Sequence, residues 1–121
     1  MIIKTDKLSV SLGKHQILTD IDLKVPHKSI YGFLGPNGAG KTTLIRALLN
    51  LVRYKKGNIE IYGKDPQKHR IELMKKIGCL IEKPVLYPHL TGKENMTLYQ
   101  KAYNLPKSSI FHSLEIVQMA E

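Results

Sequence analysis

Polar and apolar residues alternate near the start of the chain. From Ile17 to Val25, side chains such as Ile21 and Leu23 take every second position, with Asp20, Asp22 and Lys24 between them. This period of two predicts a half-buried strand with one solvated face. Residues 13–15, with a glycine, can turn the chain back from an earlier strand at about 8–12, so we expect an antiparallel hairpin.

Two short apolar runs lack this alternation. Residues 30–34 and 77–81 are apolar on successive positions, which is typical of strands buried on both faces of a parallel sheet. Between them, residues 59–62 form a strand ended by Gly63. Cys79 lies in the second run, where we expect a small core residue.

Four segments have helical patterns. Residues 42–52 are apolar almost all round, as in a helix packed on a sheet. Pro66 can begin a second helix to about Lys76. The capping-box sequence from Thr91 to Glu94 predicts a third helix through Tyr103. A fourth begins at 106–108 and is expected to continue to the end of the chain.

Composition describes a globular chain of one domain. Of the 121 residues, 42% are hydrophobic and 24% charged, and there is one cysteine, which excludes an internal disulfide and fits a reducing compartment. No apolar run approaches the roughly 20 residues of a membrane helix. Charges at Lys4 and Asp6 are too early for a signal peptide. We therefore expect a cytoplasmic protein that can dock on a membrane protein.

The formal net charge of +9 raises the question of an anionic partner. The densest basic stretch, residues 53–76, is interrupted by Glu60, Asp65 and Glu72. It carries no aromatic pairs spaced as platforms on which bases would stack. We expect scattered solvated lysines and no nucleic-acid partner.

The segment GFLGPNGAGKTT, residues 32–43, carries the chemistry. Gly35, Gly40, Lys41 and Thr42 fit the pattern G-x-x-x-x-G-K-[ST]. Gly35, Gly38 and Gly40 allow successive N–H groups to point at phosphate oxygens, and the following helix N-terminus favours negative charge. Lys41 can bridge the β- and γ-phosphates, and the Thr42 hydroxyl can bind Mg²⁺. The alternative is a simple glycine-rich turn, against which the Lys-Thr pair argues.

The amino-acid sequence around this loop resembles that of the ATP-binding subunits of ABC transporters. The resemblance rests on GFLGPNGAGKTTLIRALLNL, on KGNIEIYGKD and on IGCLIEKPVLYPHLTGKEN, and it spans nearly the whole chain. It implies an α/β P-loop NTPase fold: an antiparallel β layer, part of a parallel core, and the start of a helical subdomain. The core would occupy about 1–87 and the helical part about 88–121. The resemblance assigns binding of ATP to Gly35, Pro36, Asn37, Gly38, Ala39, Gly40, Lys41, Thr42 and Thr43.

Two positions depart from the family pattern. Glu82 stands where the family has a glutamine that contacts Mg²⁺ or the attacking water, so the resemblance makes Glu82 a metal-binding and catalytic candidate beside Thr42 and Lys41. The alternative is a solvated loop glutamate. Leu12 stands where the family often stacks an aromatic residue on adenine, and a leucine can cover the base only by apolar contact.

The resemblance covers the first half of the family's pattern. The 121 residues contain no LSGGQ signature, no apolar run ending in Asp-Glu and no later switch histidine, since His112 has a surface pattern. We expect a partial domain that binds ATP and does not hydrolyse it alone. In the family, two such subunits sandwich ATP and dock on a membrane-spanning subunit, which the loop 85–90 can contact.

The segment IEKPVLYPHLT resembles the corresponding segment of the bacitracin and lantibiotic exporters used for self-protection. Two other readings stay open: a non-transport P-loop ATPase or kinase, and a truncated, non-catalytic chain that binds a partner. The remaining histidines have no spacing typical of a metal site: His15, His27, His69 and His89.

Overall fold

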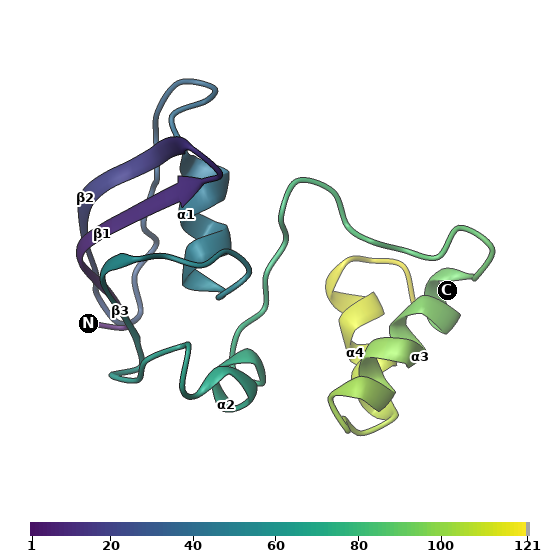
Figure 1. Ribbon diagram of the computed structural model, residues 1–121. Helices are drawn as coiled ribbons and strands as arrows, with labels where there is room; N and C mark the ends of the chain where they lie inside the picture. Colours follow the sequence, from purple (N-terminus) through teal and green to yellow (C-terminus); the bar gives the residue numbers. More distant parts are fainter. Residues whose placement is uncertain (121) are drawn as a thin grey trace. The chain divides into compact units, whose positions relative to one another are not determined.

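The computed structural model describes residues 1–120 and divides into two compact units, Met1–Ile81 and a second from Glu82 onward (Figure 1). Each unit has its own secondary structure and is described by itself. No helix among the described residues is long and apolar enough to cross a membrane.

The first unit is built on a three-stranded antiparallel sheet. The strands are β1 (Ile3–Leu12), β2 (His15–Val25) and β3 (Lys56–Ile61), in the order β2-β1-β3. Leu12 pairs with His15 next to Gly13, whose φ of 61° suits the tight turn. The predicted hairpin is therefore confirmed, with a first strand that begins earlier than expected.

One face of this sheet carries helix α1 (Lys41–Leu48), as Figure 1 shows. The alternation of the strands places Leu8, Val10 and Leu18 in the core, where they meet Leu44 and Ala47 of the helix. Burying one such leucine contributes roughly 1.5–3 kcal/mol, so this packing fixes the helix on the sheet.

Helix α1 is shorter than the predicted 42–52. Asn50 has a left-handed φ of 54°, which ends the helix after the cap at Leu49.

The two expected parallel strands are absent from the described residues. Residues 30–34 and 77–81 are not strands, and Ile30 and Leu34 are almost fully exposed, at 104% and 95%. A strand needs a neighbour for its backbone hydrogen bonds, and neither segment pairs with one in the part of the chain that the structure describes. The prediction of a strand was therefore wrong for both segments. The prediction that Cys79 is a buried core residue was also wrong, because Cys79 is exposed.

Helix α2 (Arg70–Met74) begins later than the predicted start at Pro66. The Asp65 carboxylate accepts a hydrogen bond from the Gln67 N–H at 2.8 Å, and the Asp65 carbonyl accepts from Lys68 and His69. These bonds form a turn over 65–69, so the helix starts after it.

The second unit contains two helices, α3 (Gly92–Ala102) and α4 (Ser108–Ile116). The capping box is confirmed: Thr91 Oγ1 accepts from the Glu94 N–H, and Glu94 accepts from the Thr91 N–H. Helix α4 was predicted to continue to the end of the chain, but it ends at Ile116. Gln118 has a left-handed φ of 57° just after the cap at Val117, and this conformation stops the helix.

Candidate phosphate-binding site

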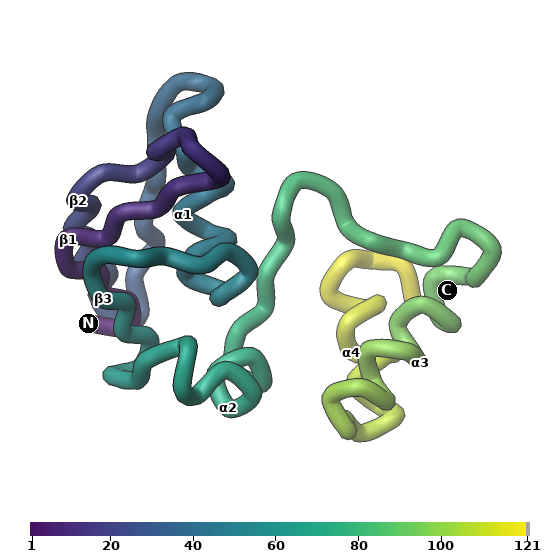
Figure 2. Tube along the Cα trace, viewed as in Figure 1, coloured from purple at the N-terminus to yellow at the C-terminus, as the bar shows by residue number. Residues whose placement is uncertain are grey.

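The glycine-rich loop joins the segment after β2 to the start of α1. Figure 2 follows the chain along this path. Gly38 and Gly40 have φ of 84° and 86°, values that other residues rarely adopt, and the Ala39 N–H donates to the Pro36 carbonyl at 3.2 Å. The loop therefore turns twice within a few residues, and residues 35–39 are exposed.

Gly40 also lies directly against β2. A Cβ atom at this position would lie 2.7 Å from Leu18 Cδ2 and 3.3 Å from the Ile17 carbonyl oxygen. Leu18 is itself buried in the core, at 4% exposure. The end of the loop is thus fixed to the sheet through a contact that only glycine permits.

Helix α1 presents unused N–H groups at its start. The first intrahelical bond runs from the Leu44 N–H to the Gly40 carbonyl at 2.9 Å, so the N–H groups of Lys41, Thr42 and Thr43 precede the regular ladder. Gly40 supplies no side-chain cap, and the first turn carries no acidic residue. The helix dipole and these donors together favour an anion at this end.

The Lys41 side chain folds back over the loop. Its Nζ donates to the carbonyl oxygens of Gly35 at 2.5 Å and Pro36 at 2.6 Å. An ammonium held at this place has a donor left for a phosphate oxygen lying in front of the helix N-terminus. The loop and the lysine together form a cradle of positive potential.

The other predicted loop residues differ in exposure. Pro36, Asn37 and Ala39 are exposed, whereas Thr42 and Thr43 in the first turn of α1 are half-buried. The Thr42 hydroxyl thus belongs to the same helix end as the free N–H groups, and such a hydroxyl is a ligand that Mg²⁺ accepts.

Leu12 and Glu82 lie outside the loop in the sequence. Leu12 ends β1 and is 43% exposed. Glu82 is exposed, has a left-handed φ of 64° and is the first residue of the second unit, whereas the loop belongs to the first. No cluster of three or more His, Cys, Asp or Glu side chains able to hold a metal exists among the described residues.

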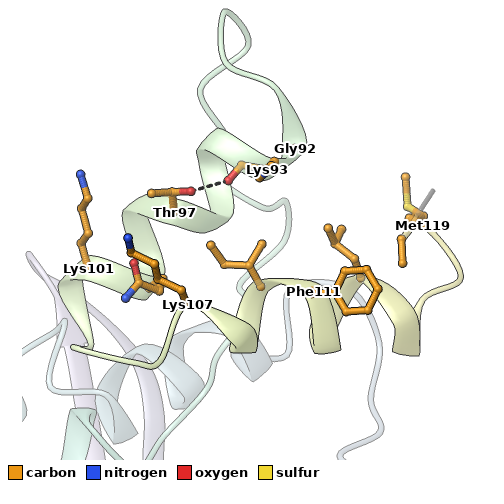
Figure 3. A pocket seen from close by; sticks show the side chains of 11 residues that line it. Gly92, Lys93, Thr97, Lys101, Lys107, Phe111 and Met119 are labelled. Carbon is orange, nitrogen blue, oxygen red and sulfur yellow. Dashed lines mark hydrogen bonds between the residues drawn. The ribbon is translucent and has the colours of Figure 1, made fainter.

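The second unit has two features that sequence reasoning missed. A groove between α3 and α4 is lined by apolar side chains, including Phe111, with Lys93, Lys101 and Lys107 beside them (Figure 3). Asn95 on α3 is buried, at 5% exposure. A single asparagine inside a helix gives no sequence signal for burial, so only the structure shows it.

Comparison with known proteins supports a family assignment. A sequence profile described as ABC transporter matches residues 18–121. The chain is 41% identical over 117 residues to "Bacitracin transport ATP-binding protein BcrA" of Bacillus licheniformis, covering 96% of this chain and 38% of that protein. It is 33% identical to "Lantibiotic transport ATP-binding protein SrtF" of Streptococcus pyogenes, covering 96% of this chain and 49% of that protein.

A solved structure gives the same result for the fold. The structure titled "Structure of ATP binding subunit of ABC transporter" superposes with a TM-score of 0.84 at 25% identity, covering 98% of this chain and 51% of the other. The predicted fold class is thereby confirmed as part of such a nucleotide-binding domain. The chain spans about two fifths to one half of the length of these relatives.

Proposed function

The chain belongs to the ABC transporter family, and from this premise we propose that its glycine-rich loop binds the phosphates of ATP in the ATP-binding subunit of a transporter. The observation that carries the proposal is the Lys41 ammonium held over the loop in front of an uncapped helix N-terminus. Charge-assisted hydrogen bonds to phosphate are about twice as strong as neutral ones, so this arrangement suits a polyphosphate.

In this proposal the residues of the loop contact the phosphates and Mg²⁺ in different ways. The N–H groups of Gly38 and of residues 40–43 donate to phosphate oxygens, and Lys41 neutralises charge on the β- and γ-phosphates. The Thr42 hydroxyl is a ligand for Mg²⁺. Asn37, with Pro36 before it and Ala39 two positions after it, keeps the loop open toward the nucleotide. Leu12 contacts the adenine by its apolar side chain.

Glu82 is proposed as an oxygen ligand of the same Mg²⁺ or as the group that orients the attacking water. A carboxylate is a good ligand for this hard cation, and its negative charge makes nucleotide binding more dependent on the metal than a glutamine would. Glu82 then acts with Lys41 in hydrolysis.

We also propose the setting of this site. The relatives named for bacitracin and lantibiotic transport suggest that the subunit powers export of an antimicrobial peptide or related compound. It would pair with a second nucleotide-binding subunit and dock, through the loop 85–90, on a membrane-spanning subunit at the cytoplasmic face of the membrane.

Calorimetric titration of Mg-ATP into the full chain tests the nucleotide site. Lys41→Ala removes one charged hydrogen bond to phosphate, so we expect about 10- to 100-fold weaker binding. Lys24→Ala, an exposed lysine on β2, removes the same charge elsewhere and should leave the affinity unchanged. Equal affinity of the Lys41→Ala protein and the wild type would overturn the proposal.

A further inference from the structure

Helix α3 carries a buried amide side chain. Asn95 is 5% exposed, and burying an amide is costly unless its donors and acceptor are paired. Every buried side-chain nitrogen and oxygen of the described residues has a hydrogen-bond partner. The partners of Asn95 therefore show what the residue does.

All side-chain partners of Asn95 are backbone atoms of the preceding loop. Its Oδ1 accepts from the Tyr87 N–H at 2.8 Å. Its Nδ2 donates to the carbonyls of Tyr87 at 3.2 Å, Leu90 at 3.2 Å and Thr91 at 3.0 Å. Only an amide combines this acceptor with these donors, because an aspartate has no donor when ionised and an alanine has neither.

A second side chain of α3 holds the other end of the loop. The Tyr99 hydroxyl donates to the Val85 carbonyl at 3.4 Å. Tyr99 lies one turn after Asn95, so both face the same side of the helix. The loop also holds itself, because the Leu90 N–H donates to the Tyr87 carbonyl at 3.1 Å and closes a turn over 87–90. Pro88 is the second residue of this turn, a position that proline favours.

The loop held in this way presents apolar side chains to solvent. Val85, Leu86 and Tyr87 are exposed at 81%, 54% and 53%. Residues 84–90 contain no Lys, Arg, Asp or Glu. Ordering a loop before binding removes part of the entropy cost of association, so a fixed apolar loop is a better contact than a mobile one.

We infer that Asn95, assisted by Tyr99, is a positioning residue: it holds residues 85–91 in one conformation and thereby sets the apolar surface that meets the membrane-spanning partner. This inference rests on the proposed function for the identity of the partner. The hydrogen bonds themselves belong to this chain alone, so the positioning is measurable without the partner.

Amide hydrogen exchange on the full chain, resolved by residue, tests the positioning. In Asn95→Ala the Tyr87 N–H loses its acceptor and the loop loses its donors, so we expect exchange at Tyr87 and Leu90 about 10- to 100-fold faster. Amides near Ala102, at the end of α3, should keep their rate. Asn95→Asp retains the acceptor and should accelerate Leu90 more than Tyr87.

Two control variants separate positioning from general destabilisation. Lys101→Ala changes an exposed side chain of the same helix and should leave the loop unchanged. Tyr99→Phe should accelerate exchange at Tyr87, the hydrogen-bonded amide nearest to Val85 in the loop, whereas Tyr103→Phe, a second exposed tyrosine at the helix end, should not. Exchange in Asn95→Ala that rises equally along all of α3, or does not rise in the loop, would overturn the inference.

The assembled transporter supplies the second measurement. Asn95→Ala should lower ATP turnover at saturating ATP while the KM for ATP remains unchanged, because the residue acts on the partner contact. A raised KM with unchanged turnover contradicts the inference. If the wild-type assembly shows no ATP turnover, the proposed function fails, and the exchange rates still decide the role of Asn95.

Discussion

Gly40→Ala tests how the phosphate-binding loop is fixed to the sheet. The substitution places a Cβ at φ of 86°, and an L-residue in the left-handed region costs about 1–2 kcal/mol. The new atom also lies 2.7 Å from Leu18 Cδ2 and 3.3 Å from the Ile17 carbonyl oxygen. Overpacking of this kind costs about 1–3 kcal/mol, because the buried Leu18 has little room to move.

Gly38→Ala is the matched control. Its φ of 84° imposes the same backbone cost, but a Cβ there meets no atom within 4 Å. We therefore expect Gly38→Ala to lower the free energy of unfolding by about 1–2 kcal/mol and Gly40→Ala by about 2–5 kcal/mol. The difference of about 1–3 kcal/mol isolates the contact of the loop with β2.

Urea unfolding followed at the β1 amide signals measures these values, because β1 reports on the first unit alone. The midpoint should fall further in Gly40→Ala than in Gly38→Ala, with the slope unchanged. Equal midpoints for the two variants would show that Gly40 is not packed against Leu18. The loop would then owe its shape to backbone angles alone.

Two further predictions concern carboxylates. Hydrogen bonds from the Thr91 N–H and hydroxyl hold the pKa of Glu94 below its ordinary value of 4.5. Their contribution to the stability of α3 is therefore full above pH 4.5 and is lost as the pH falls further, through the lowered pKa of the folded chain. Circular dichroism should show helicity falling below pH 4.5 in the wild type and a smaller change in Glu94→Gln, and equal acid profiles would contradict this. In the assembled transporter, Glu82→Ala should lower ATP turnover more than Glu82→Gln, because the amide oxygen still binds Mg²⁺. Turnover of Glu82→Ala equal to that of the wild type at every Mg²⁺ concentration would return Glu82 to a solvated loop residue.

Sequence patterns correctly predicted the elements that depend on neighbouring residues. The alternation around Ile21 gave the hairpin, and Thr91 with Glu94 gave the start of α3, because both depend on neighbouring residues. The loop sequence also indicated where α1 begins. The run 30–34 failed as a strand because strand formation needs a pairing partner, which an apolar run cannot supply by itself.

Contacts between residues far apart in the sequence could not be predicted from local patterns either. The sequence required a glycine at position 40 for the phosphate loop, but the packing of Gly40 on Leu18 depends on how β2 lies beneath it. Likewise, Asn95 is one polar residue in an amphipathic helix, and its burial follows from the path of residues 87–91. Such roles depend on tertiary structure rather than on spacing.

Amide chemical shifts during titration of Mg-ATP into the full chain test the central claim most directly. If the loop binds the phosphates, the largest shifts will occur at the N–H groups from Gly38 to Thr43, and ATP will bind more tightly than AMP because the β- and γ-phosphates are recognised. Largest shifts in the lysine-lined groove between α3 and α4, with equal affinity for ATP and AMP, would contradict the account.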